Sequence, residues 1–383
     1  MRIMRITRSF IIALLLMPAF GICFLNSCFL ADGSWKSGSP YPLEKIKVGV
    51  LYISDYQRET SGYTYAHALG IQKMQRTLRM DNSQILSVGN VSDEDPYQIE
   101  NAMRSLIAQG ATVIIATSWG YMDTCEKLAA EYPRVIFSHA SGYKRNGTNF
   151  TNFFGRIYQA RYLSGLAAGL KTKTNRIGYV AAMGPANSEV TGGINAFALG
   201  VERVNPSARI YVAVTNSWFD PLGETNAARR LIAEGCDVIA QHCDSAIPQV
   251  EAGAAGVFGI GYNSDMNYEA PEVVLTSVIW NWDVYYIHLL RSIVDGSFNA
   301  EPYFGGLLEG MVDIMPLNAG IAEPGTEAVI DAERKRLTEG AFNVFDGALK
   351  TNEGRIVGQE GYTLSDDEIK ERINWYYHTV IVR

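Results

Sequence analysis

The chain has 383 residues, of which 47% are hydrophobic and 19% are charged, and its formal net charge is −7 at neutral pH. This is the composition of an ordinary globular protein that is long enough for two lobes. The acidic balance argues against nucleic-acid binding and against electrostatic docking on anionic lipids. Beyond the N-terminal segment, nothing is apolar for as long as a membrane span requires.

The first 27 residues are typical of an export signal. Three arginines precede an apolar run over residues 10–25, which gives the charged and hydrophobic regions of such a signal. The run leads into Asn26-Ser27-Cys28, which resembles a bacterial lipobox. We therefore predict cleavage before Cys28 and lipid attachment to its thiol. A plain signal peptide cleaved nearby is the alternative. Cleavage would remove three positive charges and lower the net charge to about −10.

Residues 28–44 follow the signal, and their Gly, Ser and Pro content predicts a flexible tether. Only Cys125, Cys236 and Cys243 remain after Cys28, which is too few for a disulfide framework. The last two are seven apart along a predicted strand, so we expect them to point to opposite faces and to stay unpaired.

From residue 45 onward, short apolar strands alternate with helical patterns. Strands are predicted over 46–53, 112–117 and 135–139, and helices over 63–80 and 122–131. This alternation predicts an α/β fold whose parallel sheets carry helices on both faces.

The same plan is used twice. Residues 105–114 match residues 230–239, and the tripeptide at 68–70 matches that at 198–200. A third pair, near the start of each repeat, occurs in the same order. Three ordered matches indicate two related α/β lobes.

Polar loops follow equivalent strands of the two repeats. Residues 117–123 and 241–245 are such loops, and residues 261–265 end a further strand. Ligands of open α/β sheets bind at the carboxyl ends of the strands. We therefore expect a binding site where the lobes face each other. The candidate residues from these loops are Trp119, Tyr121, Asp123, His242, Asp244, Asn263 and Asp265.

Aromatic side chains accompany these loops. Trp280 follows an apolar strand, Tyr63 begins a helix, and Trp218 and Phe219 precede a helix whose predicted cap is Asp220. Flat rings beside a few directed polar groups suit a planar, hydrogen-bonding ligand such as a nucleobase. The alternative is that these rings, and those of the 117–123 loop, simply pack in the core.

Signatures of enzymes are missing from the sequence. It contains no P-loop, no dinucleotide fingerprint after the first strand and no nucleophile elbow. His242, Cys243 and Asp244 are adjacent, so their side chains diverge and do not form a catalytic set. No second His/Cys pair has metal-ligand spacing. We predict a binding protein with no catalytic residue, metal or cofactor; an exported hydrolase using these three residues is a remote alternative.

Seven further motifs occur in order along the chain, at residues 62–67, 116–123, 154–158, 193–197, 216–221, 261–266 and 280–282. Together they resemble the basic membrane protein (BMP) family of ABC-transporter substrate-binding lipoproteins. The resemblance runs from about Lys45 to Tyr377.

The resemblance implies a type I periplasmic-binding-protein fold, in which three crossovers join two Rossmann-like lobes. We place the crossovers near Gly155–Tyr158, Gly261–Asp265 and Gly310–Pro316. Lobe one would then comprise residues 45–156 with 264–310 returning. Lobe two would comprise 157–263 with 311–383 returning.

Family members characterised as purine-nucleoside receptors sandwich the base between two aromatics, and an aspartate at the position of Asp265 holds the ribose hydroxyls. A lysine near the next helix also contacts the ligand, and here Trp280 takes that place. The lost lysine and the added stacking surface of Trp280 favour a free purine base such as adenine, with a nucleoside second and riboflavin or another flat heterocycle as the alternative. Tyr63 stands where close relatives tend to have Trp, so this wall of the site is altered but still aromatic.

The resemblance also implies partners and a location. The receptor would deliver its ligand to an ABC permease and ATPase. It would be held on the extracytoplasmic side of the membrane by its lipid anchor.

Overall fold

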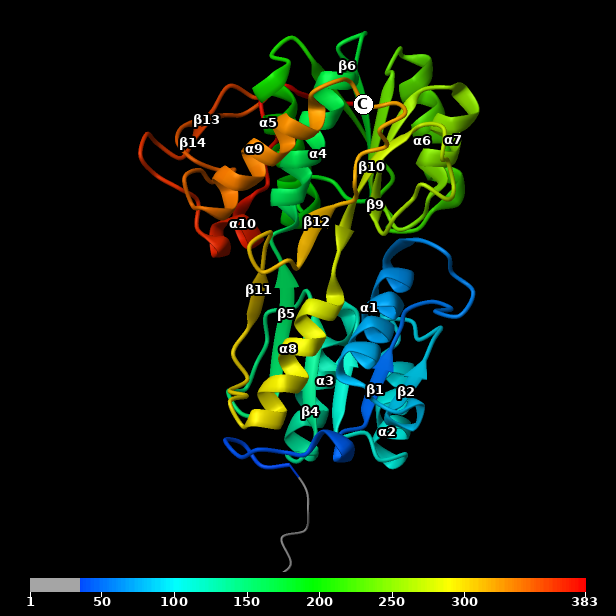
Figure 1. Cartoon of the computed structure of the whole chain (residues 1–383), viewed down its shortest axis with the longest axis vertical. Helices are drawn as coiled ribbons and strands as arrows, with labels where there is room; N and C mark the ends of the chain where they lie inside the picture. Colours follow the sequence, from blue (N-terminus) through cyan, green and yellow to red (C-terminus); the bar gives the residue numbers. More distant parts are fainter. Residues whose placement is uncertain (1–34) are drawn as a thin grey trace, which may run out of the picture. The chain divides into compact units, whose positions relative to one another are not determined.

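The computed structural model describes residues 35–383, and the predicted signal segment, Cys28 and the first part of the tether lie outside the described residues. Residues 36–383 form one unit that contains two large sheets and a small two-stranded one (Figure 1). We call the large sheet nearer the N-terminus and its helices lobe one, and the other large sheet and its helices lobe two.

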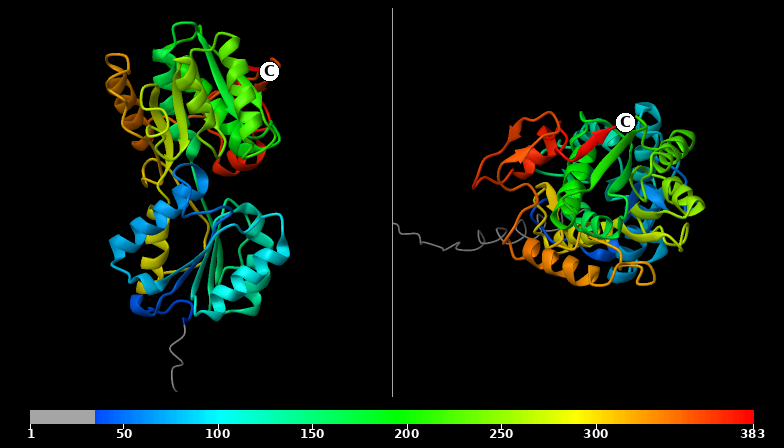
Figure 2. Two further views of the ribbon diagram at one scale, coloured as in Figure 1. Left: turned by 90° about the vertical axis from the view of Figure 1, so that its right-hand side faces the viewer. Right: turned by 90° about the horizontal axis from the view of Figure 1, so that it is seen from above.

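Lobe one is built on a parallel sheet with the strand order β11-β5-β4-β3-β1-β2. Its strands are β1 (Val48–Leu51), β2 (Ile85–Val88), β3 (Val113–Ala116), β4 (Ile136–Ala140), β5 (Phe150–Gly155) and β11 (Tyr303–Gly305). The helices α1 (Gly62–Leu78) and α8 (Trp282–Asp295) pack together on one face, and α2 (Pro96–Ala108) and α3 (Met122–Glu131) cover the other (Figure 2).

Lobe two has the strand order β12-β10-β9-β8-β6-β7-β15, with β12 antiparallel and the other pairs parallel. The strands are β6 (Arg176–Ala181), β7 (Arg209–Val214), β8 (Val238–His242), β9 (Phe258–Asn263), β10 (Val274–Trp280), β12 (Val312–Ile314) and β15 (Val380–Val382). The helices are α4 (Ile157–Lys171), α5 (Ser188–Val204), α6 (Pro221–Ala233), α7 (Ile247–Ala255) and α9 (Thr326–Thr338).

The C-terminal region adds a hairpin of β13 (Leu349–Lys350) and β14 (Ile356–Val357), and then α10 (Asp366–Arg372), which contacts α5. The two parallel sheets with helices on both faces give the type I periplasmic-binding fold that we expected.

One expected crossover lies elsewhere. The chain passes between the lobes after β5, and again between β11 and β12, close to two of the expected places. The segment Gly261–Asp265 instead joins β9 to β10 of the same sheet, and the chain leaves lobe two only after Trp280. The run 274–280 is an almost wholly buried apolar strand, so it pairs as a central strand of lobe two before α8 returns to lobe one.

The sequence repeat corresponds to equivalent structure. Residues 105–114 end α2 and lead into β3, and residues 230–239 end α6 and lead into β8. Gly110 and Gly235 have φ values of 94° and 89°, a left-handed turn that favours glycine. The repeat is therefore a helix-turn-strand unit used once in each lobe.

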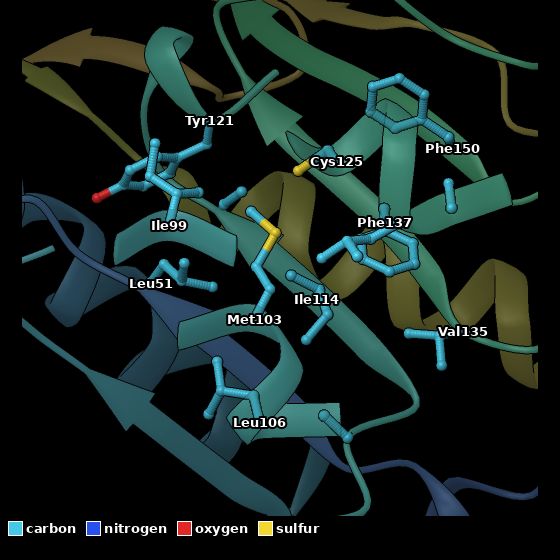
Figure 3. Packing of buried hydrophobic residues seen from close by; sticks show 14 of the residues in the cluster. Leu51, Ile99, Met103, Leu106, Ile114, Tyr121, Cys125, Val135, Phe137 and Phe150 are labelled. Atoms are coloured by element: carbon cyan, nitrogen blue, oxygen red, sulfur yellow. The ribbon is translucent and has the colours of Figure 1, made fainter. Parts of the chain in front are cut away.

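Each lobe has its own apolar core. Figure 3 shows that of lobe one, where Ile99 and Met103 of α2 meet Ile114 of β3 and Phe137 of β4. In lobe two, Cys236 and Cys243 flank β8 and pack in one cluster instead of pointing to opposite faces, and both are free thiols.

Helices α4 and α5 pack unusually closely at two glycines. A Cβ atom on Gly165 would lie 2.2 Å from the Phe197 carbonyl oxygen, and one on Gly200 would lie 2.1 Å from that of Tyr162. Backbone atoms cannot yield as a flexible side chain can, so neither position has room for a methyl group.

We expect Gly200→Ala to destabilise the protein by about 1–3 kcal/mol because the added methyl forces α4 and α5 apart. Gly192→Ala is the matched control on α5, because its Cβ would meet only Ile373 Cδ1 at 3.5 Å. That change should be neutral or stabilise by up to about 1 kcal/mol, the ordinary effect in a helix. Urea unfolding followed by circular dichroism measures both, and equal effects would contradict the close packing.

Candidate functional site

The two lobes meet through backbone at the start of α1. The Gly62 N–H donates to Ser264 Oγ at 3.2 Å, across 202 positions of sequence. Gly62 has a φ of 87°, and a Cβ there would lie 2.1 Å from the Asp244 carbonyl oxygen. The start of α1 therefore approaches the backbone of lobe two directly, with no side chain between them.

Beside this contact, half-buried Asp244 and fully buried Asn263 form a polar pair. Asn263 Nδ2 donates to Asp244 Oδ1 at 2.9 Å, and Asn263 Oδ1 is buried without a partner among the described residues. Asn263 ends β9 with a φ of 71°. Burial, with Glu189 and Glu224 as negative neighbours, raises the pKa of Asp244 to about 8.

A second group of polar side chains surrounds Glu189, which lies in the first turn of α5. The Tyr262 hydroxyl donates to Glu189 Oε1 at 3.4 Å, and His242 Nε2 lies 3.4 Å from the same oxygen. Trp280 Nε1 in turn donates to the Tyr262 hydroxyl at 3.2 Å. Burial raises the pKa of Glu189 to about 7, partly offset by the positive charge of Arg161.

Arg161 of α4 carries a fully buried charge beneath this group. Its Nη1 donates to the Gln241 carbonyl at 2.7 Å, and its guanidinium lies over the Tyr262 ring, 4.0 Å from the centroid. Its Nε and Nη2 have no partner among the described residues. Burial and this positive charge lower the pKa of His242 well below its ordinary value, so His242 is neutral.

Lobe one contributes stacked aromatic rings. Tyr63 is half-buried and meets His67 edge to face at 4.5 Å. His67 stacks on Trp282 at 4.1 Å, and Trp282 stacks on Trp280 at 4.5 Å. The buried Nε2 of His67 and Nε1 of Trp282 lack partners among the described residues.

The expected ligand contacts are not all brought together. Trp280 is 4% exposed and packed against Trp282 and Phe154. Tyr121 lies in the core of lobe one and donates to the Val91 carbonyl (Figure 3). These two rings therefore pack as core aromatics, which was the alternative interpretation of the sequence.

Other candidates lie at the surface. Trp119 and Phe219 are 57% and 64% exposed, and Asp123 is exposed and paired with Lys144 at 2.9 Å. Asp265 is half-buried and accepts the Asn267 N–H.

Trp218 is half-buried beside the polar groups of lobe two, and its carbonyl accepts the Asp244 N–H at 2.8 Å. As expected, Asp220 caps α6, with Pro221 at the first position.

Glu189, Arg161 and Tyr262 were not predicted. Glu189 follows the carboxyl end of β6, so the rule applied to the other strand ends would have found it. Arg161 interrupts an apolar helix and gives no comparable signal.

Cys243 offers no nucleophile. Its side chain is buried, and burial raises the pKa of its thiol well above the ordinary value, so the reactive thiolate does not form. Among residues 35–383, no cluster of three or more His, Cys, Asp or Glu side chains could hold a metal ion. In the same range, no helix is both long and apolar enough to cross a membrane.

Two cavities of about 270 and 280 Å³ are not lined by the polar residues of the candidate site. The first lies beside Arg156, Phe345 and Asp366, and the second beside Thr215 and Arg230. The candidate site is thus identified by buried polar atoms without partners rather than by either of these cavities.

Two lobes with facing strand ends and a polar cluster at their contact define a periplasmic-type binding protein. Residues 45–340 match the family model described as ABC transporter substrate-binding protein PnrA-like. The chain belongs to this family, which is one of extracytoplasmic substrate-binding proteins and not of enzymes.

Two curated relatives are similar over most of their length. A purine-binding protein of Brucella abortus is 33% identical over 90% of this chain and 95% of its own. A Haloferax volcanii protein, named as an ABC transporter glucose-binding protein, is 35% identical over 79% of this chain and 75% of its own.

Solved structures agree on the fold. A solute-binding protein of an ABC transporter system from Conexibacter woesei has a TM-score of 0.66 and 21% identity, covering 78% of this chain and 98% of its own. One from Aeropyrum pernix has a TM-score of 0.64 and 17% identity, covering 78% and 92%.

The raised pKa of Asp244 predicts a pH-dependent stability. Between its ordinary pKa and about 8, the unfolded carboxyl is ionised and the folded one stays protonated, so rising pH destabilises the fold. Asp244→Asn removes this titration. We expect the variant's stability relative to wild type to rise by at least about 1 kcal/mol between about pH 5 and about pH 8. Urea unfolding at both pH values measures it, and parallel behaviour of the two proteins would contradict it.

Proposed function

We propose that the protein is the receptor of an ABC importer for purines, with a free base such as adenine preferred and a nucleoside second. The observation that carries the proposal is that Tyr63 and Trp218, two half-buried aromatic residues from opposite lobes, adjoin Asp244 in the structure. Tyr63 follows Gly62, whose Cβ position meets the Asp244 carbonyl, and the Trp218 carbonyl accepts the Asp244 N–H. Buried polar atoms with unused hydrogen-bonding capacity lie beside them. A stacked aromatic contributes about 1–3 kcal/mol to base binding.

The preference for a base rests on the region around Trp280. An indole stands where purine-nucleoside receptors of the family have a ligand-contacting lysine, and it is buried and bonded to Tyr262. The side chain at this position therefore offers no positive charge to a ribose. Support for purines also comes from the Brucella relative, whose name states that class.

We also propose that the mature chain is a lipoprotein tethered through Cys28 on the extracytoplasmic side of the membrane. The segment 28–44 would let the receptor reach its permease and ATPase. The two lobes would open and close about their crossovers, with ligand entry requiring separation of the Gly62–Ser264 contact.

A panel of ligands tests the proposed function. Protein beginning after Cys28 is heated with adenine, adenosine, riboflavin or glucose, because a ligand that binds the folded state raises the melting temperature. We expect the largest shift with adenine and a smaller one with adenosine. Mass spectrometry of ligand released by heat from the purified protein provides an independent identification.

The other outcomes are equally specific. A shift with riboflavin alone would support a receptor for a different flat heterocycle. A shift with glucose alone would align the chain with its Haloferax relative, and either result would overturn the purine proposal. Recovery of chemically altered ligand would indicate a hydrolase.

Closure over the ligand predicts a strong effect at Gly62. Gly62→Ala places a methyl group against the Asp244 carbonyl, so we expect at least about a tenfold loss of adenine affinity in calorimetry. Gly256→Ala is the control, because Gly256 has a φ of 67° and open space around its Cβ position. Gly256→Ala introduces the same left-handed backbone strain, about 1–2 kcal/mol, but no contact with the other lobe. It should therefore lower the stability of the protein and leave its adenine affinity unchanged. Unchanged affinity in Gly62→Ala would exclude closure through this contact.

A further inference from the structure

We propose that Glu189 is a ligand-binding carboxylate that selects purines with an amino group over purines with a carbonyl at the same ring position. The inference rests on the proposed function and names the residue that decides which purine is taken.

The backbone fixes where Glu189 lies. The Asn187 side chain accepts the Val190 N–H and so caps α5, whose first turn begins just beyond the carboxyl end of β6. The Glu189 side chain is 24% exposed, which leaves it accessible from the edge of the lobe.

The two oxygens of Glu189 differ in their surroundings. Oε1 accepts the Tyr262 hydroxyl at 3.4 Å and lies 3.4 Å from His242 Nε2. For Oε2, no hydrogen bond or ion pair is found within residues 35–383. One side of the carboxylate is therefore held in place while the other retains its capacity to accept.

The hydrogen bond from Trp280 fixes the direction of donation. Because Trp280 can only donate, the Tyr262 oxygen accepts from it, and the single hydroxyl hydrogen of Tyr262 goes to Glu189. Tyr262 has no hydrogen left for a ligand. The buried indole thus orients the group that holds Glu189, a role that its lack of exposure does not prevent.

Two acceptors on this face of lobe two lack a partner among the described residues. They are Glu189 Oε2 and Asn263 Oδ1, of which Asn263 Oδ1 is fully buried. A ligand that supplies N–H groups satisfies these oxygens. A carbonyl placed against an ionised carboxylate leaves two acceptors facing each other and unpaired, which costs free energy.

The charged and titratable groups around Glu189 come from several elements. They are Arg161 of α4, Tyr179 of β6, His242 of β8, Asp244 after β8, Tyr262 of β9 and Tyr63 of α1. Burial outweighs Arg161 and raises the pKa of Glu189 to about 7, so the carboxyl changes charge near neutral pH.

The protonation state of Glu189 determines how the selectivity changes with pH. An amino group favours the ionised carboxylate, so its binding strengthens as the pH rises through about 7. The protonated carboxyl can instead donate to a carbonyl. Binding of purines with a carbonyl therefore weakens as the pH rises through about 7. The preference for the amino purine should therefore grow with pH.

Calorimetry with adenine and hypoxanthine, at about pH 6 and about pH 8, tests the inference. For wild type we expect adenine to bind at least about 100-fold more tightly at the higher pH, and less selectively at the lower. Glu189→Gln keeps the shape of the side chain but presents an amide that both donates and accepts. It should reduce the ratio at least about tenfold and remove its pH dependence.

Glu202→Gln is the matched control, because Glu202 lies in the last turn of the same helix and is bonded to Tyr377 and His378. It should leave the ratio and its pH dependence as in wild type. An unchanged ratio in Glu189→Gln, with adenine still bound, would overturn the inference and leave the proposed function intact. Equal wild-type affinity for the two bases would do the same. Absence of binding to either base would instead remove the proposed function, and the inference with it.

Discussion

The contact between Gly62 and the Asp244 carbonyl determines how close the two lobes can come. Because no side chain intervenes, the N-terminus of α1 lies directly against the strand ends of lobe two. Tyr63, the next residue, is thereby placed beside the polar cluster. A residue with a Cβ would hold the lobes apart by the width of a methyl group, and rings on one lobe would no longer meet carboxylates on the other.

The two lobes bring different chemistry to this contact. Lobe one supplies His67 and Trp282, which stack on each other and on Trp280 at the end of β10 in lobe two, and this largely buried stack forms a wall beside the site. Lobe two supplies Glu189 and Asp244, whose raised pKa values reflect burial without a full set of partners. Buried groups of this kind cluster at functional sites because a ligand completes their hydrogen bonding.

Much of the fold could be predicted from the sequence, because the helix-turn-strand repeat and the apolar strands are local patterns. The crossover after Trp280 was missed because an apolar run shows that a strand is buried but not which sheet it joins. Strand ends indicated Asp244 and Asn263 correctly as neighbours. The packing of Tyr121 and Trp280 could not be predicted because spacing does not reveal which face of a ring meets the core. Arg161 was missed because its environment is formed by strands far along the chain.

The close packing of α4 on α5 has a mechanical consequence. Helix α4 begins directly after the first crossover, and α5 begins one residue before Glu189. Glycine-to-backbone contacts leave the two helices no slack at Gly165 and Gly200. If the lobes rotate about the crossover as proposed, α4 and α5 would move as one rigid body, and Glu189 at the start of α5 would move with them.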